Sequence, residues 1–424
     1  MEIRAGNGSF PPEQTFWLFL SQVLAADGSC REVLRKFLAW LSIEKDGEAS
    51  PRTGAYCRAR ARLPLDALEK VHEKLAVVPA RGERRWHGRR VKVVDGSSVS
   101  MPDTPANQER YPQPSAQTAG CGFPVMRIVA VFSLGTGVLL DLAKGTLKVH
   151  ERTLFRQLWD NFQAGDVALA DTGFCSYGDF YYLGLRGVDC VMPNHQKRKV
   201  GLDMIKRLGK GERLVEWHKG PCPRWLTEEE WRDVPDRLRV REITTHVDLP
   251  GYRTEKLVTV TTLLDRRKFP KAAIEELYRR RWMAELWLRD IKTALGMEIL
   301  RCQTPDMVEK ELWMHLIAYN LIRATMNHAA RTHHVSNERI SFKGTVATIR
   351  QWVPLLSAID LSPRERIRNR ERMLHYIARD SVPMRPGRRE PRARKRRPKN
   401  YQLLTKPRRI FVETPHRGRK RGLK

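Results

Sequence analysis

Apolar residues in the first part of the chain recur every three or four positions, the spacing of one face of an α-helix. Ser50 followed by Pro51 is typical of a helix start, because serine caps the first turn and proline fits the first helical position. Pro64 ends the same helix. We therefore expect residues 1–85 to form a helical domain. Its four predicted helices cover residues 13–26, 30–41, 52–63 and 66–75.

From residue 86 the pattern changes to short apolar runs bounded by glycine or proline, which are typical of buried strands. Two of these runs flank the sequence Gly135-Thr136-Gly137 and predict a hairpin. The order strand, strand, strand, helix, strand, helix, strand predicts an α/β fold, with a mixed sheet and helices against it, as in RNase H-like folds. These elements are expected over residues 91–95, 126–134, 138–142, 150–162, 166–171, 177–185 and 188–192.

Four further segments complete the expected organisation. Residues 196–265 contain charged, strand-like pieces and are expected to form a β-rich insertion. It would interrupt an RNase H-like core made of residues 86–195 and 266–335, the second part of which has helical spacing. A C-terminal helical region over residues 336–384 and a basic tail over residues 385–424 follow.

Charge indicates a polyanionic partner. The chain has 78 Lys and Arg against 48 Asp and Glu, a formal net charge of +30. Such an excess repels itself unless a polyanion binds, and nucleic acid is the first candidate because each neutralised phosphate releases a counterion. Half of the excess lies in the tail, which has 17 Lys and Arg against 2 Glu. Arg394, Lys395 and Arg396, in its densest block, are candidate DNA contacts.

The predicted helix over residues 52–63 is also rich in arginine. Arg58 and Arg60 on this helix are candidate DNA contacts, because helical domains with one basic helix commonly bind DNA. A solvated basic face on a helix that only packs against its neighbours is an equally good interpretation. The sequence leaves both open.

Membrane and secreted classes fit the sequence poorly. No stretch approaches the roughly 20 apolar residues that a membrane helix needs. The N-terminus has no basic leader and no cleavage pattern. The seven cysteines are odd in number and lack zinc-ligand spacing, which argues against a disulfide framework or a zinc site. We expect a cytoplasmic protein with no membrane partner.

Two acids stand at the ends of predicted strands. Asp95 ends the run over residues 91–95, and Asp171 ends the run over residues 167–171. In an RNase H-like sheet these two strands are neighbours, so the carboxylates would meet and repel each other without cations. Mg²⁺ prefers such oxygen ligands, and two ions about 4 Å apart can stabilise the attacking and leaving oxygens of a phosphoryl displacement. Either acid alone could instead be a turn former.

A third acid is expected from a helix over residues 271–295. At about 100° per residue, Tyr278, Arg281, Glu285 and Lys292 fall within about 60° of one another on one face, and apolar residues cluster on the opposite face. Glu285 can bind metal, while Arg281 and Lys292 can hold phosphates on either side of it. Tyr278 can contact the DNA backbone or stack. An ordinary surface ion pair of Glu285 with a neighbouring arginine is the alternative.

The spacing Tyr-x2-Arg-x3-Glu-x6-Lys resembles the signature of the insertion sequence four family of bacterial transposases, which have an acidic DDE triad. The surrounding segments 95–98, 170–174 and 318–323 are similar to the family too, and the resemblance spans roughly residues 90–330. It implies a cut-and-paste enzyme with the triad Asp95, Asp171 and Glu285 as catalytic residues and metal ligands. It also implies two Mg²⁺ ions, for which Mn²⁺ can substitute. Some relatives stack a flipped base on a tryptophan of the insertion, where Trp217, Trp225 and Trp231 are available.

The resulting hypothesis is a DNA transposase with double-stranded DNA, both transposon ends and target, as its partner. The N-terminal helices and the basic tail would bind the terminal inverted repeats. Hydrolysis at the element's end would release a 3′ hydroxyl, which would then attack target DNA in line. Joining two ends implies a homodimer in the synaptic complex.

Two rival hypotheses differ in what happens to DNA. A structure-specific endonuclease on the same fold would cut but not join. A non-catalytic DNA-binding relic of a transposase would do neither, and it would have no need for three metal-binding acids.

Overall fold

A nine-stranded mixed sheet forms the centre of the computed structural model, which describes residues 10–45, 49–77, 83–194, 202–246, 256–357, 361–383, 406–407 and 410. Its strands are β1 (Val91–Ser100), β2 (Val125–Ser133), β3 (Leu139–Thr146), β4 (Val167–Ala170), β5 (Asp189–Pro193), β6 (Leu202–Gly209), β7 (Glu212–His218), β8 (Arg237–His246) and β9 (Lys256–Thr261). They lie in the order β3-β2-β1-β4-β5-β9-β8-β7-β6. The pairs β1–β4 and β4–β5 are parallel, and the other pairs are antiparallel. The predicted α/β class with a mixed sheet is confirmed.

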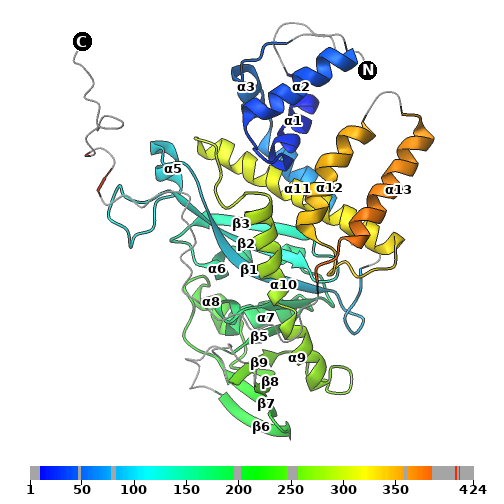
Figure 1. Ribbon diagram of the computed structural model, residues 1–424. Helices are drawn as coiled ribbons and strands as arrows, with labels where there is room; N and C mark the ends of the chain where they lie inside the picture. Colours follow the sequence, from blue (N-terminus) through cyan, green and yellow to red (C-terminus); the bar gives the residue numbers. More distant parts are fainter. Residues whose placement is uncertain are drawn as a thin grey trace.

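Alternate residues of the central strands β1, β2, β4 and β5 enter two separate cores, because successive side chains of a strand point to opposite faces. Val93 and Leu169 lie in the first core, whereas Val94 and Ala170 lie in the second. The helices α6 (Glu151–Arg156) and α7 (Tyr177–Leu185) cover the second face. The first face is covered by the N-terminal helices and by the helices that follow β9 (Figure 1).

The N-terminal helices lie where the periodicity predicts them. They are α1 (Pro12–Leu24), α2 (Cys30–Lys45), α3 (Gly54–Arg62) and α4 (Leu65–Val77). The later helices are α9 (Lys271–Arg279), α10 (Trp282–Arg289), α11 (Pro305–Thr332), α12 (Phe342–Leu356) and α13 (Pro363–Arg379). In Figure 1 the N-terminal helices, in blue, and α12 and α13, in orange, lie side by side above α11. Arg350 of α12 donates hydrogen bonds to the carbonyls of Leu24 and Ala25, which ties the two groups of helices together.

The 28-residue helix α11 carries the polar contacts that fix it to the sheet. Asn320 is fully buried, and its amide both accepts from the Leu139 N–H (3.0 Å) and donates to the Leu139 carbonyl (2.9 Å). β3 is an edge strand, so the amide takes the place of a missing neighbouring strand. The Tyr319 hydroxyl donates to the carbonyl of Gly137 in the β2–β3 turn (2.6 Å). Arg323 in turn donates to that hydroxyl (3.0 Å).

Strands β6 to β9 extend the same sheet beyond β5 (Figure 1). Val191 of β5 pairs with Thr261 of β9, so β9 lies between β5 and the strands β8, β7 and β6, which precede it in the chain. A fully buried ion pair joins Arg241 of β8 to Glu212 of β7 (2.6 Å). The loop between β7 and β8 contains a short helix, α8 (Glu228–Asp233), which begins in a capping box made by Thr227 and Glu230.

Three local expectations differ from the structure. Strand β1 does not end at Asp95 but continues to Ser100, because β2 pairs with it along that whole length. The expected helix over 271–295 ends after Arg279, restarts at Trp282 and turns into a π-helix over Asp290–Ala294. The expected helix over residues 150–162 covers only Glu151–Arg156, and a 3-10 turn follows at Trp159–Asn161. After β1 the chain also forms a short helix, α5 (Pro105–Arg110), capped by the side chain of Thr104. Among the described residues, no helix is both long enough and apolar enough to cross a membrane.

Replacing Asn320 by leucine is expected to lower the free energy of unfolding by roughly 2–4 kcal/mol. The substitution would leave the N–H and the carbonyl of Leu139 buried without partners. Urea unfolding followed by circular dichroism measures the effect. His328→Leu, on a half-buried position of the same helix, is the matched control and should change stability by less than about 1 kcal/mol. Equal stability of the two variants would show that the amide does not hold the edge strand.

Candidate active site

Two carboxylates leave the sheet side by side. The parallel register of β1 and β4 ends with the pair Val94 and Ala170, and Asp95 and Asp171 are the next residue of each strand. Because neighbouring strands lie about 4.8 Å apart, both side chains lie close together where the β1–β4 pairing ends, and they point toward the same face. The N–H of Gly96 donates to Asp95 (2.9 Å), and the N–H of Thr172 donates to Asp171 (2.7 Å). These contacts orient one oxygen of each carboxylate.

The third acid comes from α10, which packs on the same face of the sheet. Ala284, Trp287 and Ile291 are buried in the first core, as the predicted apolar face requires. Glu285 is about one-third exposed, and its Oε1 accepts a hydrogen bond from Arg281 (2.9 Å). The break before Trp282 does not separate these two residues, because Arg281 is the N-cap of α10.

Lys292 lies in the π-helical turn and reaches back to β1. Its Nζ donates to the Ser97 hydroxyl (3.2 Å), two residues after Asp95. A buried pair of Asp290 with Arg323 (2.9 Å) holds the turn against α11. A cleft of about 350 Å³ lies between β1 and α10, and its lining includes Asp95, Ser97, Trp282, Glu285 and Lys292.

Burial dominates the electrostatics of Asp95. Burial raises the pKa of the Asp95 carboxyl, Arg281 and the Gly96 N–H lower it, and the charges of Glu285 and Asp171 add smaller upward shifts, with a net pKa of about 6. Burial also raises the pKa of Tyr278 to about 12. The Arg281 guanidinium lies 5.8 Å from the centre of the Tyr278 ring. All four residues of the predicted row, with both strand acids, therefore belong to one neighbourhood.

This donor set fits hard divalent cations. Carboxylate oxygens are the ligands that Mg²⁺ and Mn²⁺ prefer, and the carboxylates of Asp95 and Glu285 both line the cleft. Within the described part of the chain, no three His, Cys, Asp or Glu side chains are close enough together to hold an ion. Arg281 is the cation that neutralises Glu285 in this arrangement.

The other candidate DNA contacts divide into three cases. Arg58 is exposed on α3. Arg60 was expected to contact DNA, but its side chain is buried, donates to Gln22 (3.2 Å) and lies over the ring of Phe19. Such a position suits packing of α3 on α1 rather than a phosphate contact. The block Arg394 to Arg396 lies outside the described residues.

The tryptophans of the β-rich region are mostly unavailable for stacking. Trp217 and Trp231 are buried in the second core, and Trp225 is half-buried beneath the guanidinium of Arg156 (3.9 Å). By contrast, Trp282 is 54% exposed at the cleft itself. Trp282 was not among the tryptophans expected to stack, although its place next to Arg281 in the four-residue signature marks it. An exposed indole beside the carboxylates of Asp95 and Glu285 can stack on an unpaired base.

Comparisons with known proteins agree with the geometry. The family described as "Transposase DDE domain" matches residues 86–321, more than half of the chain. The transposase InsG for insertion sequence element IS4 from Escherichia coli (strain K12) is 28% identical over 321 residues, which are 74% of this chain and 70% of that protein. A cryo-EM structure of the piggyBac transposase synaptic complex with hairpin DNA aligns over 87% of this chain and 86% of its own at 9% identity. Its TM-score of 0.40 is too low to carry an inference.

Asp95→Asn is expected to stabilise the metal-free protein at pH 7.5. The folded protein keeps the Asp95 proton up to about pH 6, whereas the unfolded chain releases it near the ordinary pKa of 3.8. Stability is therefore lost as the pH rises between these values, and the full cost, roughly 1–3 kcal/mol, is present above pH 7. The neutral amide avoids this cost.

Urea unfolding in EDTA at pH 7.5 and pH 4 measures the difference. We expect Asp95→Asn to exceed wild type at pH 7.5 and to match it at pH 4. Asp236→Asn, at a position whose side chain is 94% exposed, is the control and should change neither value. A variant no more stable than wild type at pH 7.5 would contradict the assigned electrostatics.

Proposed function

Because the chain belongs to the DDE transposase family, in the insertion sequence four group, we propose that it moves a bacterial insertion sequence by cutting and pasting. Membership of this family makes it a metal-dependent enzyme of DNA cleavage and strand transfer. In the proposed reaction it binds the terminal inverted repeats, hydrolyses the phosphodiester at each element end and joins the freed 3′ hydroxyls to target DNA. The observation that supports this most strongly is that Asp95 and Glu285 line one cleft, while Asp171 follows the strand paired with that of Asp95 and acts electrostatically on it.

The three acids are proposed to be the catalytic residues and the metal ligands. Two Mg²⁺ ions, or Mn²⁺ in their place, would activate the attacking oxygen and stabilise the leaving oxygen of the displacement. Gly96 and Thr172 orient Asp95 and Asp171 through their backbone N–H groups, so each acid presents its second oxygen. Arg281 holds Glu285 from the neighbouring turn.

The cations of the row are proposed to hold the DNA backbone across the cleft. Arg281 and Lys292 lie on either side of Glu285 along α10 and the π-helical turn, and each can pair with a phosphate next to the scissile one. Tyr278 keeps its hydroxyl proton at every physiological pH, so it can donate a hydrogen bond to a phosphate oxygen. Arg281 now pairs with Glu285. If bound metal ions neutralised Glu285, Arg281 would be free to pair with a phosphate instead.

The finer architecture of the protein is part of the proposal. The strand order β3-β2-β1-β4-β5, with two parallel pairs after an antiparallel meander, supports an RNase H-like core in residues 86–195 and 266–335. Residues 196–265 would be its β-rich insertion and residues 336–384 its helical extension. We propose that residues 1–85 and the tail, residues 385–424, bind the element ends.

Exposed Arg58 on α3 supports the role of the N-terminal helices, and the tail contributes through its charge, including Arg394, Lys395 and Arg396. Two ends must meet for joining, so a homodimer in the synaptic complex is proposed. The site of action would be the nucleoid in the bacterial cytoplasm.

The test is cleavage and joining of a labelled duplex that carries the element's own end. Wild type with Mg²⁺ or Mn²⁺ should cut at the end and join it to a second DNA. Glu285→Gln should bind the duplex as tightly as wild type but lose both reactions by at least about 10³-fold, because a neutral amide is a poor metal ligand. Glu276→Gln changes an exposed acid of α9, outside the row, and should stay within about threefold of wild type.

The possible results separate the rival functions. Cutting without joining would identify a nuclease. Binding without metal-dependent chemistry in either protein would identify a DNA-binding relic. Full activity in Glu285→Gln would overturn the assignment of the triad.

A further inference from the structure

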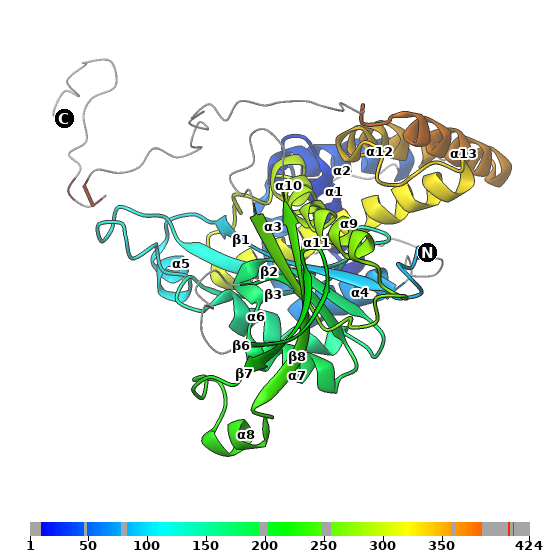
Figure 2. The same ribbon diagram turned by 90° about the horizontal axis from the view of Figure 1, so that it is seen from below.

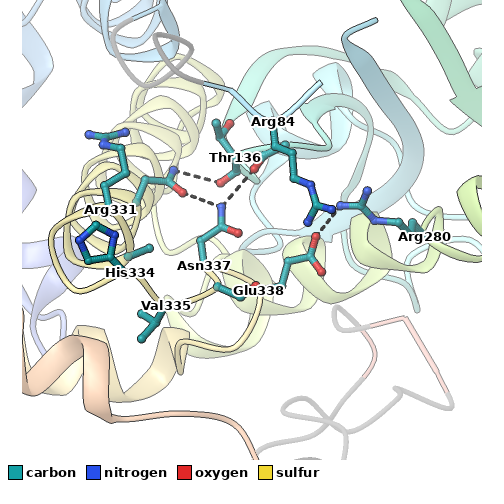
Figure 3. Close-up of a pocket in the computed structure, with 12 residues that line it drawn as sticks. Arg84, Thr136, Arg280, Arg331, His334, Val335, Asn337 and Glu338 are labelled. Atoms are coloured by element: carbon teal, nitrogen blue, oxygen red, sulfur yellow. Dashed lines mark hydrogen bonds and ion pairs between the residues drawn. The ribbon is translucent and has the colours of Figure 1, made fainter. Parts of the chain in front are cut away.

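A second pocket, lined by cationic side chains, lies away from the acidic cleft, beyond the break between α9 and α10. It has a volume of about 430 Å³ and lies between the C-terminal end of α11, the β2–β3 turn and Arg280. Figure 3 shows Arg84, Arg280, Arg331 and His334 around it, contributed by separate segments of the chain. Arg280 and Arg281 are consecutive, yet Arg280 lines this pocket while Arg281 pairs with Glu285 of the triad.

The wall of the pocket is held by a network of side-chain amides. Asn337 donates to Asn327 (2.7 Å) and to the Gly135 carbonyl (3.1 Å), and Asn327 donates to the Thr136 carbonyl (3.1 Å) (Figure 3). These bonds connect the loop after α11 with the β2–β3 turn. The pocket is therefore a built feature of the fold rather than a gap between mobile side chains.

The lining has excess positive charge. Arg280 pairs with Glu338, but within the described part of the chain neither Arg84 nor Arg331 forms a salt bridge. The carbonyl end of α11 contributes about half a negative charge. With His334 counted as neutral, the net charge of the three arginines, Glu338 and the helix end is still more than about one positive charge. The pocket would therefore attract an anion.

His334 keeps a backbone conformation that its side chain disfavours. Its φ is +53°, in the left-handed region, where glycine or asparagine usually ends a helix. The N–H of Val335 donates to the Ala330 carbonyl (3.0 Å), which closes the turn around it. This turn ends α11 and places the His334 imidazole in the lining of the cationic pocket.

A row of cations on α13 comes close to the same region. The ring of His375 on α13 lies 5.3 Å from that of His333, the residue before His334. On a helical wheel His375 shares one exposed face with four arginines, and that face spans about 22 Å. The row consists of Arg364, Arg368, Arg372, His375 and Arg379, all exposed. No arginine of this row forms a salt bridge with another described residue.

We propose that the pocket seats a backbone phosphate of duplex DNA and that the α13 row continues the contact along about six base pairs. This second surface rests on the proposed function and would hold DNA flanking the reacting bond. The length of the row favours a duplex over a small phosphate compound, since the latter would fill the pocket alone. The junction of α9 and α10 then connects this surface to the triad through the adjacent residues Arg280 and Arg281.

The test uses the full chain with the Asp95→Asn change, in EDTA, so that binding is read without chemistry. Fluorescence anisotropy with a labelled 30-base-pair duplex gives the affinity at several salt concentrations. Arg84→Ala/Arg331→Ala should weaken binding by roughly tenfold at 100 mM KCl and lower the slope of log K against log[salt] by about 2. The triple variant Arg364→Ala/Arg368→Ala/Arg372→Ala should lower the slope of log K against log[salt] by about 3.

The matched control is Arg186→Ala/Arg232→Ala, two exposed arginines at the end of α7 and on α8, away from this surface (Figure 2). It should keep the wild-type slope. His334→Gly removes both the strain and the imidazole, so its melting temperature should rise by about 1–3 °C while its DNA affinity falls by about threefold. Inorganic phosphate at 10 mM and constant ionic strength should not displace the duplex.

The outcomes are distinguishable from those for the main function. If the pocket and row variants keep the wild-type slope while the enzyme with an intact triad cuts DNA, this inference is wrong and the function stands. If the slope falls but the intact enzyme shows no metal-dependent chemistry, the DNA surface stands and the function fails. An equal loss in the control variant, or displacement by inorganic phosphate, would also overturn the inference.

Discussion

The parallel pairing of β1 with β4 is the constraint on which the acidic cleft depends. It aligns Val94 with Ala170 and so leaves Asp95 and Asp171 as neighbours where the pairing ends. A slip of one residue in either strand would turn one carboxylate to the opposite face, because side chains alternate along a strand. The buried residues on both faces of these strands oppose such a slip, since it would also exchange the two cores. The packing of the two cores thus fixes the positions of the Asp95 and Asp171 carboxylates, although charged groups themselves do not belong in an apolar core.

Helix α11 holds the π-helical turn that follows α10 and so fixes the helical wall of the cleft. Arg323 pairs with Asp290 in the π-helical turn and donates to Tyr319, which is itself tied to the β2–β3 turn. Asn320 secures the edge strand beside them. One face of a single helix therefore fixes both the sheet and the segment that carries Lys292. Tyr319, Asn320 and Arg323 of the segment 318–323 make these contacts. They lie outside the cleft, but they hold the elements that shape it.

Much of this arrangement follows from local sequence, and the remainder depends on tertiary contacts. The apolar runs predicted the core strands and the hairpin, and the spacing from Tyr278 to Lys292 predicted residues that share one neighbourhood. The break after Arg279 was not predictable from periodicity, because the residues on both sides keep helical spacing. The burial of Arg60 was missed for a similar reason: its partner Gln22 lies on a different helix. The extension of β1 to Ser100 needed the length of β2, which lies elsewhere in the chain.

The adjacency of β5 and β9 has a consequence for how such proteins can vary. Pro193 of β5 pairs with Thr259 of β9, and β8, β7 and β6 follow outward from β9 in the same sheet. The outermost strand, β6, pairs only with β7 among the described strands. A change in the length of β6 or of its turn to β7 would therefore leave the register of β1 and β4 untouched. This far edge of the sheet can vary while the acids beside β1 and β4 stay in place.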